Sequence, residues 1–186
     1  DPRVSGGEPR GSATLYEDPL SLTTSTTVVA RKRDTNYSSS VNGPDQEWSA
    51  PVRTRFYIGS VPAGPDNLIV SEIMYNPPGP SDEEEEAGFD VDDLFEFIEL
   101  RNIADSPLDL TGVTVRGESD FDFPEGFVLG SGEHVVLARD RAAFAARYGS
   151  AITTYGPVDG SLSNRGGRIA LRDFHGALIR EFQYDD

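Results

Sequence analysis

Short runs in which apolar and polar residues alternate, each bounded by glycine or proline, most constrain the fold of this 186-residue chain. The run "FEFIELRN" at residues 95–102 is typical: Phe97 and Glu99 point to one face, and Ile98 and Leu100 to the other. A period of two predicts a half-buried β-strand. With 19 glycines and 13 prolines, the chain favours many turns over long helices. The predicted class is therefore all-β, with two β-sandwiches in tandem.

Strand-like runs occur on both sides of residue 60. They span residues 21–33, 50–58, 68–76, 95–102, 109–117, 126–140 and 168–184. One short helix is predicted over 140–148, with Asp140 as its N-cap and Gly149 ending it. Phe144 and Tyr148 lie one turn apart, so both are expected to be buried where the helix packs on a sheet.

The net charge of −16 is unevenly distributed. Residues 1–60 carry seven acidic and seven basic side chains, and residues 61–186 carry 25 acidic against 9 basic. This change predicts a boundary near residue 60, with a first domain at 1–62, a linker at 63–67 and a second domain at 68–186. The negative part is expected to be repelled by nucleic acid, and no apolar run is long enough for membrane insertion.

No complete set of catalytic residues is recognisable. There is no cysteine, which excludes disulfides and thiol chemistry. His134 lies in a strand-like run and His175 at a hairpin turn, and both are interpreted as structural or surface residues. Glu96 and Glu99 resemble an acid–base pair in type, but three positions apart on a strand they point to opposite faces. The chain is therefore predicted not to be an enzyme.

The segment 81–93 concentrates acidic residues. It contains eight carboxylates, namely Asp82, Glu83, Glu84, Glu85, Glu86, Asp90, Asp92 and Asp93. Four consecutive glutamates repel one another, so we expect a solvated, extended insertion whose mobile part is 81–88. The alternative is a weak calcium site formed by Asp90, Asp92 and Asp93, since calcium prefers oxygen ligands. No other cofactor is expected.

Four stretches carry a family resemblance: "LIVSEIMYNP", "EFIELRNIADSPLDLTGVTV", "FDFPEGFVLGSGEHVVLARD" and "GSLSNRGGRIALRDFHGALIREFQYDD". Together they resemble the lamin tail domain in its prokaryotic, secreted form, over about residues 66–186. The resemblance implies an immunoglobulin-like β-sandwich. Val113 departs from it, because the family usually has Trp there.

The first part has its own resemblance. "LYEDPLSLTTSTTVVARKR" and "WSAPVRTRFYI" resemble the C-terminal half of the β-sandwich appended to chitobiase and β-hexosaminidase. This likeness implies a partial β-sandwich whose leading strands are missing.

Both resemblances imply accessory domains of larger proteins. The expected function is a non-catalytic extracellular or cell-surface module for adhesion, anchoring or spacing. Its expected partners are the other domains of the parent protein, and a surface protein or glycan. The alternative is a carbohydrate-binding accessory domain of a secreted hydrolase, with Tyr37, Trp48 and Tyr155 as candidate sugar contacts.

Overall fold

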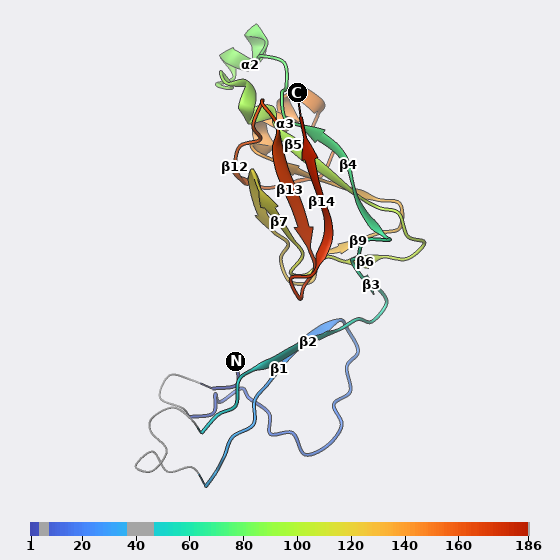
Figure 1. Ribbon diagram of the computed structural model, residues 1–186. Helices are drawn as coiled ribbons and strands as arrows, with labels where there is room; N and C mark the ends of the chain where they lie inside the picture. The colour runs from blue at the N-terminus through green and yellow to red at the C-terminus, as the bar shows by residue number, and fades with distance from the viewer. Residues whose placement is uncertain (4–7, 37–46, 186) are drawn as a thin grey trace. The chain divides into compact units, whose positions relative to one another are not determined.

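The computed structural model describes residues 1–3, 8–36 and 47–185. It divides the chain into two units, Asp1–Gly59 and Ser60–Asp186 (Figure 1). Within the described part of the chain, no helix is long and apolar enough to cross a membrane.

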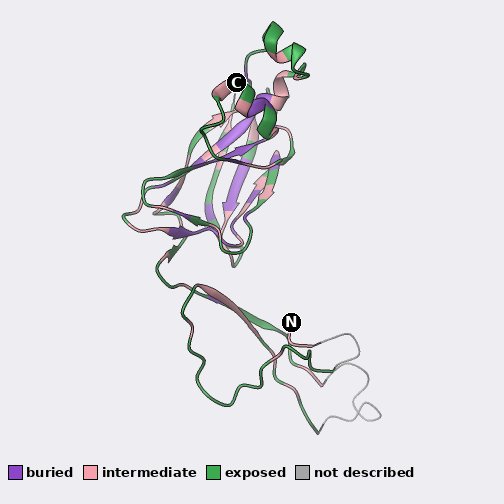
Figure 2. Ribbon diagram, turned by 180° about the vertical axis from the view of Figure 1, so that it is seen from behind, coloured by how far each residue is buried: buried purple, intermediate pink, exposed green. Residues whose placement is uncertain are grey.

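The first unit contains a two-stranded antiparallel ribbon. Strand β1 (Thr26–Ala30) pairs with β2 (Val52–Phe56), and Thr26 lies opposite Phe56. Arg55 is the one buried residue among those described in this unit, and its Nη1 donates to Thr27 Oγ1 at 2.9 Å. The side chains of Val52 and Phe56 remain 65% and 47% exposed, and Figure 2 shows this unit almost without buried residues.

The second unit contains two main sheets and one small one. The first sheet has the strand order β11 (Thr154–Tyr155), β10 (His134–Ala138), β5 (Phe97–Asn102) and β4 (Leu68–Met74). The second has the order β12 (Asp159–Gly160), β8 (Ser119–Asp122), β7 (Thr114–Gly117), β13 (Gly167–Arg172) and β14 (Leu178–Tyr184). The small sheet has the order β3 (Val61–Pro62), β6 (Leu108–Asp109) and β9 (Val128–Leu129).

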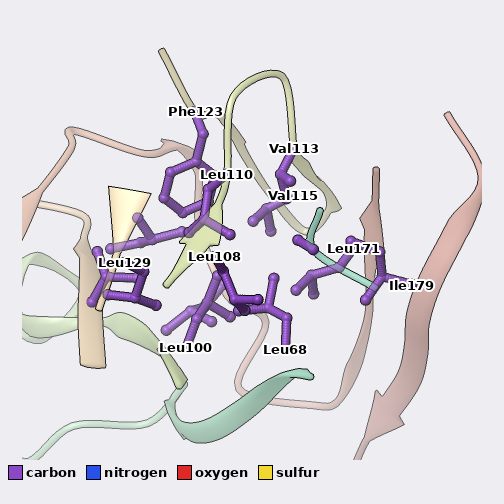
Figure 3. Packing of buried hydrophobic residues seen from close by; sticks show 14 of the residues in the cluster. Leu68, Leu100, Leu108, Leu110, Val113, Val115, Phe123, Leu129, Leu171 and Ile179 are labelled. Atoms are coloured by element: carbon purple, nitrogen blue, oxygen red, sulfur yellow. The ribbon is translucent and has the colours of Figure 1, made fainter. Parts of the chain in front are cut away.

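The core lies between the two main sheets. The alternation in β5 points Ile98 and Leu100 into this layer, where they join Leu137 of β10 and Leu171 of β13. Figure 3 shows Leu100 and Leu171 from the two main sheets converging with Leu108 and Leu129 of the small sheet. The predicted immunoglobulin-like β-sandwich is therefore confirmed for the second unit.

Helix α3 (Arg141–Tyr148) covers the outer face of the first sheet. Asp140 caps it as predicted, with Oδ1 accepting from the backbone amides of Ala142 and Ala143 at 2.8 and 2.9 Å. Phe144 is 3% exposed and packs edge-on against Phe97, with 5.3 Å between ring centroids. Tyr148, in the last turn, also packs edge-on against Phe97, with 5.6 Å between ring centroids, but it is only half-buried, not buried as expected.

Residues 63–67, expected as a linker, lie within the second unit. Val61 of β3 pairs with Leu108 in a parallel ladder, and Ala63 is buried in the core. The Asn67 side chain accepts from the Gly64 amide at 2.7 Å and donates to the Pro62 carbonyl at 3.0 Å. These contacts pack the segment against the sandwich.

Candidate functional site

The acidic run begins as a helix. Residues Asp82–Glu86 form α2, which starts at Ser81 with a reciprocal capping box. Ser81 Oγ accepts from the Glu84 amide at 3.3 Å, and Glu84 Oε2 accepts from the Ser81 amide at 2.8 Å. Acidic side chains in the first turn also interact favourably with the helix dipole. The expectation of an extended segment over 81–88 is therefore wrong, although the pattern Ser-x-x-Glu was there to indicate a helix start.

Arg147 of α3 binds this helix to the sandwich. Its Nε and Nη2 donate to the two carboxylate oxygens of Glu84, each at 2.8 Å. Its Nη1 donates to the Pro78 carbonyl at 2.8 Å, and its guanidinium lies 3.4 Å from the centre of the Phe95 ring. The hydrogen bonds from Arg147, followed by the Ser81 amide, lower the pKa of Glu84 from 4.5 to about 2. One arginine thus fixes both ends of the acidic segment.

The segment returns to the sandwich through a 3-10 helix, η1 (Asp92–Phe95), directly before β5. Phe95 is fully buried beneath Arg147. The next residue, Glu96, is a carboxylic acid that is only 2% exposed. It lies on the same face of the chain as Ile98, which places it at the end of the apolar layer.

Glu96 is held by the loop between β12 and β13. The Leu162 amide donates to Glu96 Oε2 at 2.9 Å, and Ser161 Oγ lies 3.3 Å from both carboxyl oxygens. Arg139 Nη1 is 3.6 Å from Glu96 Oε2 and donates to the Gly160 carbonyl at 2.6 Å. These contacts join the start of β5 to a loop more than 60 residues away in sequence.

Burial raises the pKa of Glu96 from 4.5 to about 7. The Leu162 amide acts in the opposite direction, Asp93 raises the pKa further, and Arg139 and Ser161 lower it. The sequence contains one indication of this residue, because the alternation that continues into β5 puts the acidic side chain of Glu96 on the apolar face. Its partners in the β12–β13 loop were not foreseeable from local sequence.

The three calcium candidates lie on either side of the start of η1. Asp90 is exposed, whereas Asp92 and Asp93 are half-buried. Asp92 Oδ1 accepts from the Asp93 amide at 3.1 Å, and Asp93 Oδ2 lies 3.3 Å from Ser161 Oγ. Among residues 1–3, 8–36 and 47–185, no three His, Cys, Asp or Glu side chains are grouped so that they could hold a metal ion. The calcium hypothesis stays a prediction for a binding experiment.

His134 lies near a serine and a glutamate on the outer face of the first sheet. Ser71 Oγ donates to Glu99 Oε1 at 2.6 Å, and His134 Nε2 is 3.8 Å from the same oxygen. In a hydrolase the imidazole must contact the serine hydroxyl to accept its proton. Here the hydroxyl contacts the carboxylate instead, so this arrangement does not activate Ser71 as a nucleophile.

His175 occupies the predicted hairpin turn between β13 and β14. Its amide donates to Asp173 Oδ1 at 2.9 Å, and its ring packs edge-on against Phe174. Both contacts are local to the turn and shape the hairpin.

The aromatic candidates for sugar contacts have neighbours within the fold. Trp48 is half-buried, and the Arg33 guanidinium lies 5.5 Å from its ring centre. Tyr155 packs against Phe127 at 4.7 Å and against the main core. Tyr37 lies outside the described residues.

Comparison with known families gives one match. Residues 62–186, about two thirds of the chain, match the family model described as Lamin Tail Domain. A search of curated proteins finds no match.

Proposed function

Because the chain belongs to the lamin tail domain family, whose members are immunoglobulin-like modules, we propose that it is a non-catalytic accessory module. In this proposal it serves adhesion, anchoring or spacing within a larger secreted or surface protein. The secreted form of the family, the cell-surface location and the chitobiase-like character of the first unit are parts of the same proposal.

The proposal rests mainly on one observation: the two carboxyl groups with strongly shifted pKa values, Glu84 and Glu96, are bonded to other parts of the same fold. Glu84 is bonded to Arg147 of α3, and Glu96 is enclosed by the β12–β13 loop. Catalytic acids and bases need access to a substrate as well as a shifted pKa. Glu96, at 2% exposed, lacks that access. The two groups instead join elements to one another.

A further buried polar residue supports a structural role for the loops. Asn102 is fully buried, and its Nδ2 donates to the carbonyls of Leu129 and Gly130 at 3.0 and 2.8 Å. Its Oδ1 accepts from the Ala104 amide at 2.8 Å. A rigid sandwich with such tied loops suits a spacer or a docking module.

The partners proposed are the neighbouring domains of the parent protein, and a surface protein or glycan. The excess of negative charge after residue 60 disfavours nucleic acid. A glycan partner would bind elsewhere than on Trp48 and Tyr155, because these two rings already contact Arg33 and Phe127.

The location is tested on intact cells that produce the parent protein with an epitope tag beside this module. External protease should remove the tag without cell lysis, or the tagged protein should appear in the medium. A tag that is protected until the cells are lysed would overturn the extracellular assignment.

The binding role is tested on the same parent protein with and without residues 60–186. We expect deletion to weaken retention at the surface while the activity of the remaining domains is unchanged. A glycan array with both proteins provides the second measurement. Sugar binding that is lost on deletion would favour the carbohydrate-binding alternative. An enzymatic activity that is lost on deletion and that residues 60–186 catalyse by themselves would contradict the proposal.

A further inference from the structure

Ser161 lies between two carboxyl groups that belong to another part of the chain. Its Oγ is 3.3 Å from Asp93 Oδ2 and 3.3 Å from both oxygens of Glu96. A serine hydroxyl carries a single proton, so it can donate to one of these groups but not to both. When both carboxyl groups are ionised, one of them therefore receives no hydrogen bond from Ser161 Oγ.

The other neighbours of Glu96 do not replace that missing donor. The Leu162 amide supplies one hydrogen bond, to Oε2. Arg139 Nη1, at 3.6 Å, is beyond hydrogen-bond distance and donates to the Gly160 carbonyl instead. An ionised carboxylate that is 2% exposed would thus have one direct amide donor and a negative neighbour in Asp93. A buried charge with so few donors is costly.

A proton on Glu96 would satisfy all of these groups together. Glu96 Oε1–H would donate to Ser161 Oγ, and the Ser161 hydroxyl would then donate to the Asp93 carboxylate. The Leu162 amide would continue to donate to Oε2, which becomes the carbonyl oxygen of the neutral acid. Each hydrogen atom then has an acceptor, and Asp93 alone remains negatively charged.

We propose that Glu96 takes up one proton when the second unit folds, and that Glu96, Ser161 and Asp93 then form a hydrogen-bond relay. This relay fastens the start of β5 and the 3-10 helix before it to the loop between β12 and β13. The protein thereby contains an internal proton-binding site that strengthens this connection in mildly acidic solution and weakens it above neutral pH.

The charged and titratable groups around Glu96 come from three neighbouring elements. Asp93 in η1 opposes ionisation of Glu96, and Arg139 after β10 favours it. Tyr184 of β14 is close enough to sense Glu96 and Glu118, and burial is the largest cause of its own raised pKa. Burial and Asp93 together outweigh the Leu162 amide, Arg139 and Ser161, so the pKa of Glu96 is raised to about 7.

The sign of the pH dependence follows from this raised pKa. An unfolded chain releases the proton near pH 4.5, whereas the folded protein keeps it to about pH 7. The stabilisation is therefore complete below about pH 4.5 and is lost as the pH rises through 7.

The main test measures unfolding by urea from pH 4.5 to 8 for the intact chain and for Glu96→Gln. The glutamine amide supplies the donor without a titrating proton, so the relay persists at every pH. Relative to this variant, the folding constant of the wild type should fall about 100-fold across the range. Glu85, which is exposed in α2, provides the matched control, Glu85→Gln, which should keep the wild-type pH dependence. Equal pH dependence in the wild type and Glu96→Gln would overturn the proposal.

A second measurement does not depend on the stability of Glu96→Gln. Carboxyl carbon NMR of the glutamate-labelled wild type should show one group with a midpoint near pH 7. In Asp93→Asn this midpoint should move to lower pH, whereas Asp92→Asn should leave it in place. If all glutamate midpoints lay below pH 5, the proposed proton uptake would be wrong. If the midpoint were unchanged in Asp93→Asn, the relay would be wrong.

Discussion

At the scale of single residues, Arg147 makes several long-range contacts that no local sequence pattern predicted. It reaches two carboxylate oxygens of Glu84, the backbone carbonyls of Pro78 and Gly79, and the Phe95 ring. A guanidinium can make these contacts simultaneously because its donors form a planar fork and its face can stack. Replacement by lysine would keep the charge but lose the bidentate geometry.

Glu84→Gln should lower the stability of the second unit at neutral pH. The pKa of Glu84 is lowered to about 2, so its stabilisation is present above pH 4.5 and is lost as the pH falls through 2. Urea unfolding should therefore show a difference between wild type and Glu84→Gln that is constant above pH 5 and shrinks toward pH 2. Glu85→Gln, in the same helix but exposed, is the control. A difference that persists unchanged at pH 2 would contradict this account.

Phe144→Ala should destabilise the second unit by about 3–5 kcal/mol, because the side chain is nearly fully buried against Phe97 of β5. Chemical denaturation gives this value directly. Phe144→Leu, which keeps most of the apolar volume, should cost clearly less. A cost below about 1 kcal/mol for the alanine variant would show that α3 does not depend on this contact.

Residues with local partners were predictable, and residues with distant partners were not. Asp140 begins α3 and Gly149 ends it as expected, because both caps use local partners: Asp140 accepts from the Ala142 and Ala143 amides, and the Gly149 amide donates to the Ala145 carbonyl. Glu84 and Glu96 depend on Arg147 and on Ser161–Leu162, which are 63 or more positions away. The sequence contains no local signal for such pairs, so the candidate site could not be assembled from it.

At the scale of elements, the short strand β12 positions the loop that encloses Glu96. Gly160 pairs with Ser119 of β8 and has φ of 94°, a region that favours glycine. A Cβ atom at Gly160 would lie 2.4 Å from the Glu118 carbonyl oxygen. The glycine therefore allows both the backbone turn and the close approach of the two strands.

Gly160→Ala should cost at least 1–2 kcal/mol, roughly, and should loosen the β12–β13 loop. Hydrogen exchange should be faster at the Leu162 amide, which bonds Glu96, than in the wild type. Gly176→Ala is a useful comparison, because its φ is also positive but a Cβ there meets no atom within 4 Å. If both variants affected the Leu162 amide equally, the close approach to Glu118 would not be the cause.

The strands and α3 were predictable as elements because alternation and capping are encoded within ten residues. Helix α2 was not predicted, because repulsion among four glutamates favours an extended chain. The capping box at Ser81 and Glu84 starts the helix nevertheless. The hydrogen bonds from Arg147 of α3 to Glu84 stabilise α2 and offset part of this repulsion.

Calcium should raise the melting temperature of the chain no more than sodium chloride of equal ionic strength does. The reason is that both salts would only screen the charges of the carboxylates, which are Asp90, Asp92 and Asp93. Thermal melts with calcium, with chelator and with sodium chloride make this comparison. A saturable rise specific to calcium, abolished in the double variant Asp90→Asn/Asp92→Asn, would instead establish the calcium site.

At the scale of the whole molecule, the two units differ in how much they bury. The second unit has a continuous apolar core, whereas the described residues of the first include no buried apolar side chain. Two-stranded ribbons without such a core are marginal in water. The compositional boundary near residue 60 was visible in the sequence, and the resemblance of the first part implied an incomplete sandwich. The exposure of Val52 and Phe56 was not visible, because they look like ordinary strand residues.

A fragment of residues 60–186 should unfold cooperatively, and a fragment of residues 1–59 should not. Differential scanning calorimetry of each, at equal concentration, distinguishes them. A sharp, concentration-independent transition in the shorter fragment would show that its ribbon is stable without additional strands.

The contacts of β14 with the residues just before and just after β4 have a mechanical consequence if the module transmits force between neighbouring domains. Arg180 Nη2 of β14 donates to the Pro65 carbonyl at 3.1 Å, and the ring of Tyr75 packs on that of Tyr184 at 4.9 Å. The first contact lies near the start of β14 and the second at its end, so residues 65 and 184 lie at opposite ends of this strand (Figure 1). Tension applied through these two points therefore acts along β14 and shears it against β13, where the hydrogen bonds of the whole ladder share the load.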